Sequence, residues 1–272
     1  RSKAQAKAFK EKQRRNKAKK DSIKNYWVAC FHDPIKQVIE EDKLTLEQLG
    51  LLMKLVPRLW FNTDNKLIED NKPLRKKDIA RIAKISVKQA ERHLNALCKH
   101  GLMHKEREGR GYVYYISEKF HKIAGMDNKL GDNFGFKKAF TKVYKKSQPI
   151  IDKLKLQEAG LLWKITPYFH YSKYYLSKNP NEVECPELYY FTHTELAEEL
   201  GMSPWNLTLL MKGLLKNFIL KANKTGTTVH YIVNPDILFR QEKEDGYTEA
   251  IREQFKAHKV STMRTLKDEL DY

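Results

Sequence analysis

Cysteine and long apolar runs are scarce in this sequence. Its 272 residues contain three cysteines, Cys30, Cys98 and Cys185, which are odd in number and too widely spaced for a zinc knuckle. They offer no disulfide framework, so we expect buried free thiols in a reducing compartment. No stretch approaches the roughly 18 apolar residues that cross a bilayer, and no signal-peptide core is present near the start. We therefore expect a soluble protein of the cytoplasm with no membrane partner.

Motifs for catalysis are missing as well. The phosphate-binding pattern G-x-x-x-x-G-K-[ST] does not occur, which argues against ATP hydrolysis. The tyrosine-rich stretch 168–178 contains His170, but the paired-histidine metal site of a strand-nicking enzyme is absent, and we interpret this stretch as core and inter-domain packing. His100 and His104 have the spacing of two ligands on one helix face, but Gly101 between them begins a turn, so no helix face presents both. We expect no catalytic residue, no metal and no cofactor, and hence a protein that is not an enzyme.

Positive charge is abundant and unevenly distributed. The formal net charge of +18 indicates a polyanionic partner. Residues 1–24 carry eleven Lys or Arg against two acidic residues, which is half of the net charge of the chain. We interpret residues 1–24 as a basic arm that is helical at most when bound, and a solubilising tail is the alternative.

The chain contains an internal repeat. The phrase GLLMKLVPRL begins at Gly50, and GLLWKITPYF begins 110 residues later, at Gly160. From Leu74 and Phe191 onward, the two copies align without a gap at an offset of 117. This repeat predicts two homologous domains in a pseudo-two-fold arrangement. We assign the basic arm to 1–24, the domains to 25–130 and 154–240, a linker or connecting helix to 131–153, and a C-terminal helical tail to 241–272.

Each copy predicts the same order of elements. The repeated phrase forms a first helix that a proline ends, and a short second helix leads to a tight turn. Ser86 or Ser203 then caps a third helix, whose core face in the first copy contains Ala90, Leu94 and Leu97. Two alternating segments around a glycine-containing turn predict a β-hairpin. The expected fold is mostly α with small β-hairpins, in the α+β class.

This order resembles the winged helix–turn–helix superfamily, over roughly residues 44–124 and 154–240. A tandem pair is similar to the architecture of plasmid replication initiators with two winged-helix domains. The segment YIVNPDILFR, at 231–240, is similar to the end of winged-helix replication proteins from Firmicute plasmids. The resemblance implies a DNA-binding fold in which the helix after Ser86 enters the major groove and the hairpin contacts backbone or minor groove.

The first copy has the charge that this function needs. Residues 74–119 contain twelve Lys or Arg and five Asp or Glu. Gln89 can pair with adenine, and Lys88 or Arg92 with guanine. We expect Lys99 to face outward with them, and Arg81 to support them from the preceding helix. The candidate DNA-binding residues of this domain are Arg75, Lys76, Lys77, Lys84, Ser86, Lys88, Gln89, Arg92, His93, Lys105, Arg107 and Arg110.

The second copy has lost most of these cations. Trp205, Leu209 and Leu210 stand where the first copy has Lys88, Arg92 and His93, and residues 191–240 have a net charge of only +1. The helix after Ser203 is apolar almost all the way round, so we expect it to be buried. We expect this helix to be covered either by its own domain together with residues 168–190, or by an interface with the first domain or with another subunit. The candidate residues for a secondary DNA contact or an interface are Ser203, Trp205, Asn206, Thr208, Leu209, Lys212 and Lys224.

Together these patterns predict a sequence-specific double-stranded DNA-binding protein. The resemblance favours a plasmid or phage replication initiator that binds origin repeats, associated with a plasmid or the nucleoid. The second domain would then serve self-association or recruit host replication proteins. A winged-helix transcription regulator, such as a repressor, and a partition or interaction adaptor are the alternatives.

Overall fold

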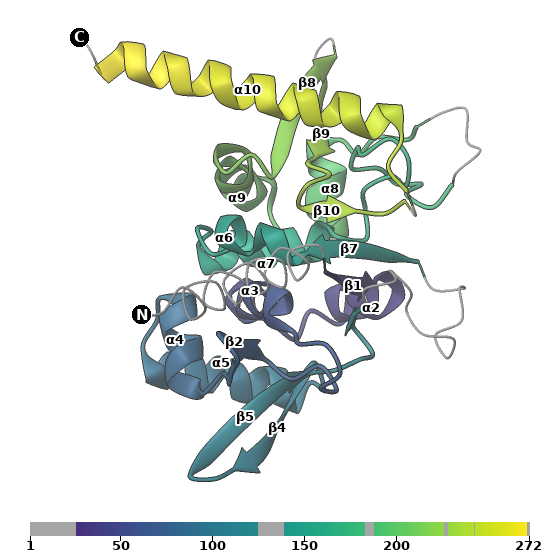
Figure 1. The fold of residues 1–272 in the computed structure, drawn as a ribbon. Helices are drawn as coiled ribbons and strands as arrows, with labels where there is room; N and C mark the ends of the chain where they lie inside the picture. The colour runs from purple at the N-terminus through teal and green to yellow at the C-terminus, as the bar shows by residue number, and fades with distance from the viewer. Residues whose placement is uncertain (1–25, 125–138, 183–187, 226–227, 242, 271–272) are drawn as a thin grey trace, which may run out of the picture.

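The computed structural model describes residues 26–124, 139–182, 188–225, 228–241 and 243–270. The expected basic arm at 1–24 lies outside these residues, as does Cys185. The described part is a mixed α+β structure of helices and small antiparallel sheets (Figure 1). Its buried residues form one main hydrophobic cluster that runs from Val28 to Phe255, so the two copies share a core.

Five elements of each copy correspond in type and order, and all but the second helix of each copy are equal in length. The first copy consists of α3 (Leu46–Leu55), α4 (Lys76–Ala83), α5 (Val87–Lys99), β4 (Met103–Glu108) and β5 (Gly111–Ile116). The second consists of α7 (Leu156–Ile165), α8 (His193–Glu199), α9 (Pro204–Lys216), β8 (Leu220–Thr225) and β9 (Thr228–Val233). The bounds of α5, β4 and β5 reappear 117 residues later in α9, β8 and β9, and those of α3 reappear 110 residues later in α7. The predicted order of elements is therefore confirmed in both copies.

The repeated phrase lies where α3 and α7 cross, in the middle of the molecule (Figure 1). A methyl group added at Gly50 would overlap the backbone carbonyl of Leu156, and one added at Gly160 would overlap that of Leu46. Both pairs of equivalent residues differ by 110, so the two contacts are reciprocal. The glycines are repeated because each lets the opposite helix backbone approach without a side chain between them.

Two buried lysines follow the same reciprocal relation. Lys54 Nζ donates to the carbonyl oxygens of Ile151 (3.3 Å) and Asp152 (2.9 Å). Lys164, its equivalent, donates to the carbonyl of Leu200 (2.7 Å) and lies 3.8 Å from Asp42 Oδ1. Burial lowers the pKa of Lys54 to about 8 and also lowers the pKa of Lys164. Lys54 thus links α3 to the segment before α7, and Lys164 links α7 to the segment before α3 and to the end of α8.

A four-stranded antiparallel sheet joins the two copies and was not expected. Its order is β10 (Leu238–Phe239), β7 (Phe140–Tyr144), β1 (Trp27–Phe31) and β6 (His121–Ile123). Because β7 lies within residues 131–153, the prediction of a linker or connecting helix there was wrong for this part. The β-branched and aromatic residues of β7 pair with β1 and β10 on both sides. This sheet contains strands from both predicted domains, so they do not form separate bodies.

Short elements complete the described chain. Thr45 and Gln48 form a capping box that begins α3, and Pro57 lies in the 3-10 turn that follows it. The smaller elements are α2 (His32–Glu41), η1 (Val56–Arg58), β2 (Ile68–Glu69), β3 (Lys72–Pro73), η2 (Lys145–Ser147) and α6 (Gln148–Ile151). Phe169, His170 and Tyr174 are buried, which confirms the expected packing role of the tyrosine-rich stretch.

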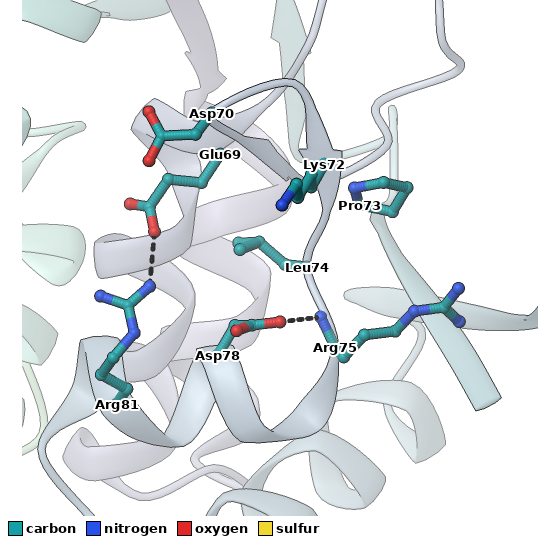
Figure 2. A pocket seen from close by; sticks show the side chains of 8 residues that line it. All are labelled: Glu69, Asp70, Lys72, Pro73, Leu74, Arg75, Asp78 and Arg81. Carbon is teal, nitrogen blue, oxygen red and sulfur yellow. Dashed lines mark hydrogen bonds and ion pairs between the residues drawn. The ribbon is translucent and has the colours of Figure 1, made fainter. Parts of the chain in front are cut away.

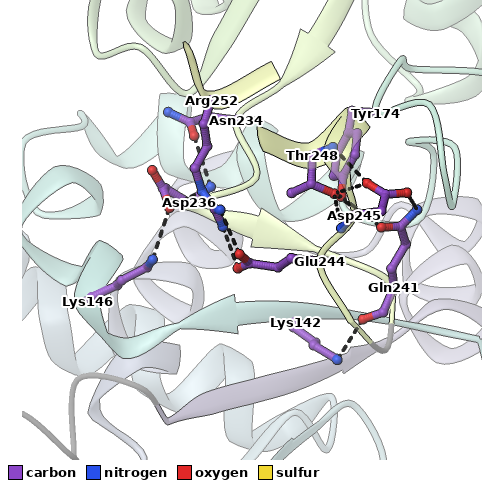
Figure 3. Close-up of polar contacts among 10 residues, drawn as sticks. All are labelled: Lys142, Lys146, Tyr174, Asn234, Asp236, Gln241, Glu244, Asp245, Thr248 and Arg252. Atoms are coloured by element: carbon purple, nitrogen blue, oxygen red, sulfur yellow. Dashed lines mark hydrogen bonds and ion pairs between the residues drawn. The ribbon is translucent and has the colours of Figure 1, made fainter. Parts of the chain in front are cut away.

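The predicted helical tail is α10 (Gly246–Leu270), which crosses the molecule beside β8 and β9 (Figure 1). Ile251 and Phe255 bury their side chains in the main cluster. Figure 3 shows the polar contacts at its beginning, where the Arg252 guanidinium bridges Asp236 (2.9 Å) and Glu244, and Tyr174 Oη bonds Thr248 Oγ1 (2.8 Å). The first turns of α10 are therefore docked on the second copy.

A buried histidine joins the sheet to the crossing helices. Trp163 Nε1 donates to His121 Nε2 (3.0 Å), and His121 Nδ1 lies 3.2 Å from Cys30 Sγ. Burial lowers the pKa of His121 to about 3 and raises that of the Cys30 thiol. Cys30 is thus a buried free thiol as expected, whereas Cys98 is half-exposed.

This histidine makes stability sensitive to acid. Its folded pKa lies below the unfolded value of 6.5, so the stabilisation is present above pH 6.5 and is lost as the pH falls toward 3. We expect His121 to reduce the free energy of unfolding by about 2 kcal/mol between pH 6.5 and 5, at ~1.4 kcal/mol per pH unit. Urea denaturation of wild type and His121→Gln at several pH values measures this. Equal pH slopes for the two proteins would contradict it.

Candidate nucleic-acid interface

The turn between α4 and α5 fixes how α5 is presented. Lys84 ends α4 in the left-handed conformation (φ +57°), and Ser86 Oγ accepts from the backbone N–H of Gln89 (3.1 Å). The capping role expected of Ser86 is confirmed. The Asp78 carboxylate accepts from the backbone N–H of Arg75 (2.9 Å), which begins α4. Both helices therefore start at defined residues, and their side chains have fixed directions.

The exposed side of α5 carries a stripe of polar residues. Lys88, Arg92, Asn95 and Lys99 are all exposed, and their spacing of four, three and four places them on one line along the helix. The opposite side buries Ala90, Leu94 and Leu97, as the sequence predicted. We call these four residues the α5 stripe. It offers three cations and one amide, and a helix with its side chains has the width of a DNA major groove.

His93 does not belong to this surface, and its assignment as an outward DNA contact was wrong. Its side chain is only 6% exposed because it lies three residues after Ala90, on the side of α5 that faces the core. Its Nε2 lies 3.9 Å from Glu47 Oε2, and burial lowers its pKa. Gln89 is half-buried for the same reason, since it lies on the edge of the core face.

The β4–β5 hairpin stands next to the stripe. Lys105 Nζ donates to Asn95 Oδ1 (3.1 Å) and lies 5.1 Å from the centre of the Tyr112 ring. Arg107 pairs with Tyr112 across the two strands, so it shares the hairpin face with Lys105. Gly109, with φ +63°, is the first of two residues in the turn, and the second, Arg110, is exposed. The α5 stripe and this hairpin face form one continuous cationic surface.

The other face of the hairpin is attached to the body. Lys66 Nζ forms an ion pair with the Glu108 carboxylate, and the Arg75 guanidinium donates to the Glu108 carbonyl (3.0 Å). Lys66 lowers the pKa of Glu108 by this hydrogen bond. Glu108 therefore holds the hairpin against β2–β3 and α4, and Arg75 acts mainly through that attachment.

Ion pairs divide the predicted cations into two groups. Lys76 pairs with Glu91 (2.8 Å) and Arg81 with Glu69 (2.8 Å), while Arg75 is engaged with Glu108. Among the described residues, eight of the predicted cations are exposed and form no ion pair. These are Lys77, Lys84, Lys88, Arg92, Lys99, Lys105, Arg107 and Arg110. The second group keeps its charge available for a polyanion, because no protein carboxylate neutralises it.

An open groove of about 580 Å³ lies beside this surface, between β2–β3 and the start of α4 (Figure 2). Its charged groups are largely compensated, because Arg81 bonds Glu69 and Asp78 accepts from the Arg75 backbone. Within the described part of the chain, no group of three or more His, Cys, Asp or Glu side chains is placed to hold a metal ion.

In the second copy, α9 presents a stripe of different chemistry. Ser203 caps it by accepting from the Asn206 backbone N–H (3.3 Å), as predicted. Leu207, Met211 and Leu214 are buried, yet Trp205 is 70% and Leu209 is 42% exposed. The two residues that replace Lys88 and Arg92 are therefore exposed, and of the covers expected for this helix only one by another subunit stays a prediction for them. Within the described residues, neither its own domain nor the first copy covers them.

The remaining candidates of the second copy lie on α9 and β8. Asn206, Thr208, Lys212 and Lys224 are exposed, and Thr208 Oγ1 bonds His193 Nε2 (2.9 Å). Lys212 and Lys216 continue the line of Trp205 and Leu209, with the same spacing as the α5 stripe. We call Trp205, Leu209, Lys212 and Lys216 the α9 stripe.

Sequence reasoning missed Asn95, Lys66 and Tyr112. Asn95 could have been found, because it lies seven residues after Lys88 and three after Arg92. Lys66 could not, since only the folded chain brings β2–β3 to the hairpin. Comparisons with protein-family models, curated proteins and solved structures found no match for this chain. Among the described residues, no helix has the length and apolarity to cross a bilayer.

Proposed function

We propose that this chain binds double-stranded DNA through the α5 stripe and the adjoining face of the β4–β5 hairpin, and that each copy is a winged helix. The observation that carries the proposal is the contact between Lys105 and Asn95, which makes one surface of the helix and the hairpin. In this arrangement α5 enters the major groove, and Arg107 and Arg110 lie at the flanking phosphates. The resemblance to winged-helix proteins supports the same orientation.

Base reading is assigned to the α5 stripe. Lys88 and Arg92 are suited to guanine O6 and N7, and Asn95 is better exposed than Gln89 for a bidentate contact with adenine. Lys77, Lys84 and Lys99 lie at the margins, where phosphate contacts set register without reading sequence. Lys76 and Arg81, which are already paired, contribute less.

Binding should depend steeply on salt. Each neutralised phosphate contributes ~0.9 to the slope of log affinity against log salt, so about five contacts from the unpaired cations give a slope near −4 to −5. Fluorescence anisotropy with a random duplex at several salt concentrations measures it. A slope near zero would contradict the electrostatic part of the proposal.

For the biological role, we propose a plasmid or phage replication initiator that binds origin repeats. The tandem arrangement and the similarity of residues 231–240 to plasmid replication proteins support this role. Footprinting on the DNA neighbouring the gene tests it. Protected direct repeats would support an initiator, one palindrome overlapping a promoter would indicate a transcription regulator, and no protected site would indicate an interaction adaptor.

A further inference from the structure

The α9 stripe is an exposed apolar surface in a position where the first copy is cationic. Trp205 and Leu209 lie one helical turn apart on the side of α9 opposite its core residues. Isolated exposed apolar side chains are ordinary, but two large neighbours on one helix face form a contact surface. Nothing within the described chain shields them, since α10 packs on Phe218 and Lys221 instead.

The charge around the stripe disfavours DNA as its occupant. Trp205 and Leu209 replace Lys88 and Arg92, and the exposed Glu198 of α8 replaces Arg81 of α4. Three cations are thus lost, and a carboxylate stands in place of one of them. Phosphate contacts dominate the affinity of proteins for DNA, so this surface has lost the interaction that most DNA binding requires.

The stripe is complementary to itself. Its first half is apolar, its second half contains Lys212 and Lys216, and the exposed Glu198 stands on α8, five residues before the α9 cap Ser203 in the sequence. When two such helices pair in antiparallel orientation, Trp205 of one can pack on Leu209 of the other. Lys216 then reaches toward the end of the opposite α8, where Glu198 is exposed. Because this pairing is two-fold symmetric, the Trp205–Leu209 contact and the Lys216–Glu198 contact would each form twice.

We propose that a second copy of this chain covers the α9 stripe, through an antiparallel two-fold pairing of α9 with α9. The contact joins the second halves of two chains and leaves the α5 stripe of each exposed. It is short, since the stripe extends from Trp205 to Lys216, or about 16 Å of helix. Its affinity is therefore expected in the micromolar range typical of small interfaces, about 1–50 μM.

Sedimentation velocity of the full chain without DNA, at about 1 to 100 μM, tests the proposal across that range. Trp205→Lys combined with Leu209→Arg replaces the two apolar residues of the α9 stripe by cations, as at the equivalent positions of the first copy, and should weaken dimerisation at least tenfold. Lys88→Ala with Arg92→Ala, at the equivalent positions of α5, is the matched control and should leave it unchanged. A chain that stays monomeric throughout, or equal effects of both pairs, would overturn the proposal.

A charge exchange tests the register. Lys216→Glu alone and Glu198→Lys alone should each weaken the dimer, and the two together should restore it, because each contact then joins opposite charges again. Failure of the double variant to recover would overturn this pairing.

Tryptophan fluorescence reports the same contact directly. Of the four tryptophans, Trp27 and Trp163 are buried and Trp60 is half-buried, so acrylamide quenches mainly Trp205. Quenching should fall as the protein concentration rises. If Trp205→Ala with Leu209→Ala instead weakens duplex binding while self-association is unchanged, α9 contacts DNA, and the proposal is overturned. The sedimentation result does not depend on DNA, so it is separate from the test of the α5 stripe.

Discussion

Replacing Lys88 and Arg92 together by alanine is expected to abolish sequence-specific DNA binding. Both side chains are exposed on the α5 stripe and neither forms an ion pair among the described residues, so their removal does not disturb the fold. Each base contact contributes ~1–3 kcal/mol of discrimination, and the loss of both lowers the specificity ratio at least about thirtyfold. Anisotropy measurements with a selected site and a scrambled duplex determine that ratio.

The matched control uses the equivalent pair of the second copy. Trp205→Ala with Leu209→Ala should preserve the specificity ratio, because these residues carry no charge and are assigned to self-association. The comparison is made at protein concentrations well below those at which the chain dimerises. Equal losses of specificity from the two pairs would show that the assignment of DNA reading to α5 is wrong.

Gly50→Ala is expected to lower the free energy of unfolding by about 3 kcal/mol or more. In an exposed helix this change stabilises by ~0.5–1 kcal/mol, because alanine is the better helix former. Here the added methyl group would overlap the Leu156 carbonyl, and both backbones are held by helical hydrogen bonds. The helices α3 and α7 must then separate, which opens the shared core. Urea denaturation of the variant measures the loss.

Two other glycines provide controls for this prediction. Gly246, at the start of α10, has no atom within 4 Å of an added methyl group, so Gly246→Ala should be neutral or slightly stabilising. Gly213→Ala meets the end of the flexible Glu158 side chain, which can move, and should cost about 1 kcal/mol. If Gly50→Ala were no more destabilising than Gly213→Ala, close approach of the α3 and α7 backbones would not be the reason for the glycine.

Local features of the sequence were sufficient for most elements. The offset of 117 between the copies predicted equivalent helices and hairpins, and the bounds of α5, β4 and β5 agree residue by residue with those of α9, β8 and β9. Ser86 and Ser203 were identified as caps because a hydroxyl followed by a free backbone N–H is a local arrangement. The turn at Gly109 was also predicted from local sequence, because a glycine readily adopts the positive φ that this turn needs.

Exposure of particular side chains was predicted less well. His93 was assigned to the surface because it is polar, and that assignment was wrong. Trp205 was expected to be covered because it is apolar, and within the described chain it is exposed. Position on the helix decides exposure: His93 lies beside the core positions of α5, and Trp205 lies opposite those of α9. The line of polar residues from Lys88 to Lys99 could have been found by the same periodicity.

The sequence by itself determined that there are two equivalent modules, where their helices and turns begin, and that one module is cationic and the other is not. Only the tertiary structure decided that Gly50 and Gly160 form the crossing of the two halves, that β7 joins them in one sheet, and which cations are already paired with carboxylates. The physical reason is how far apart in the sequence the interacting residues lie. Caps, turns and periodicity act between residues a few positions apart, whereas a helix crossing, a strand pairing or an ion pair depends on residues that only the folded chain brings together.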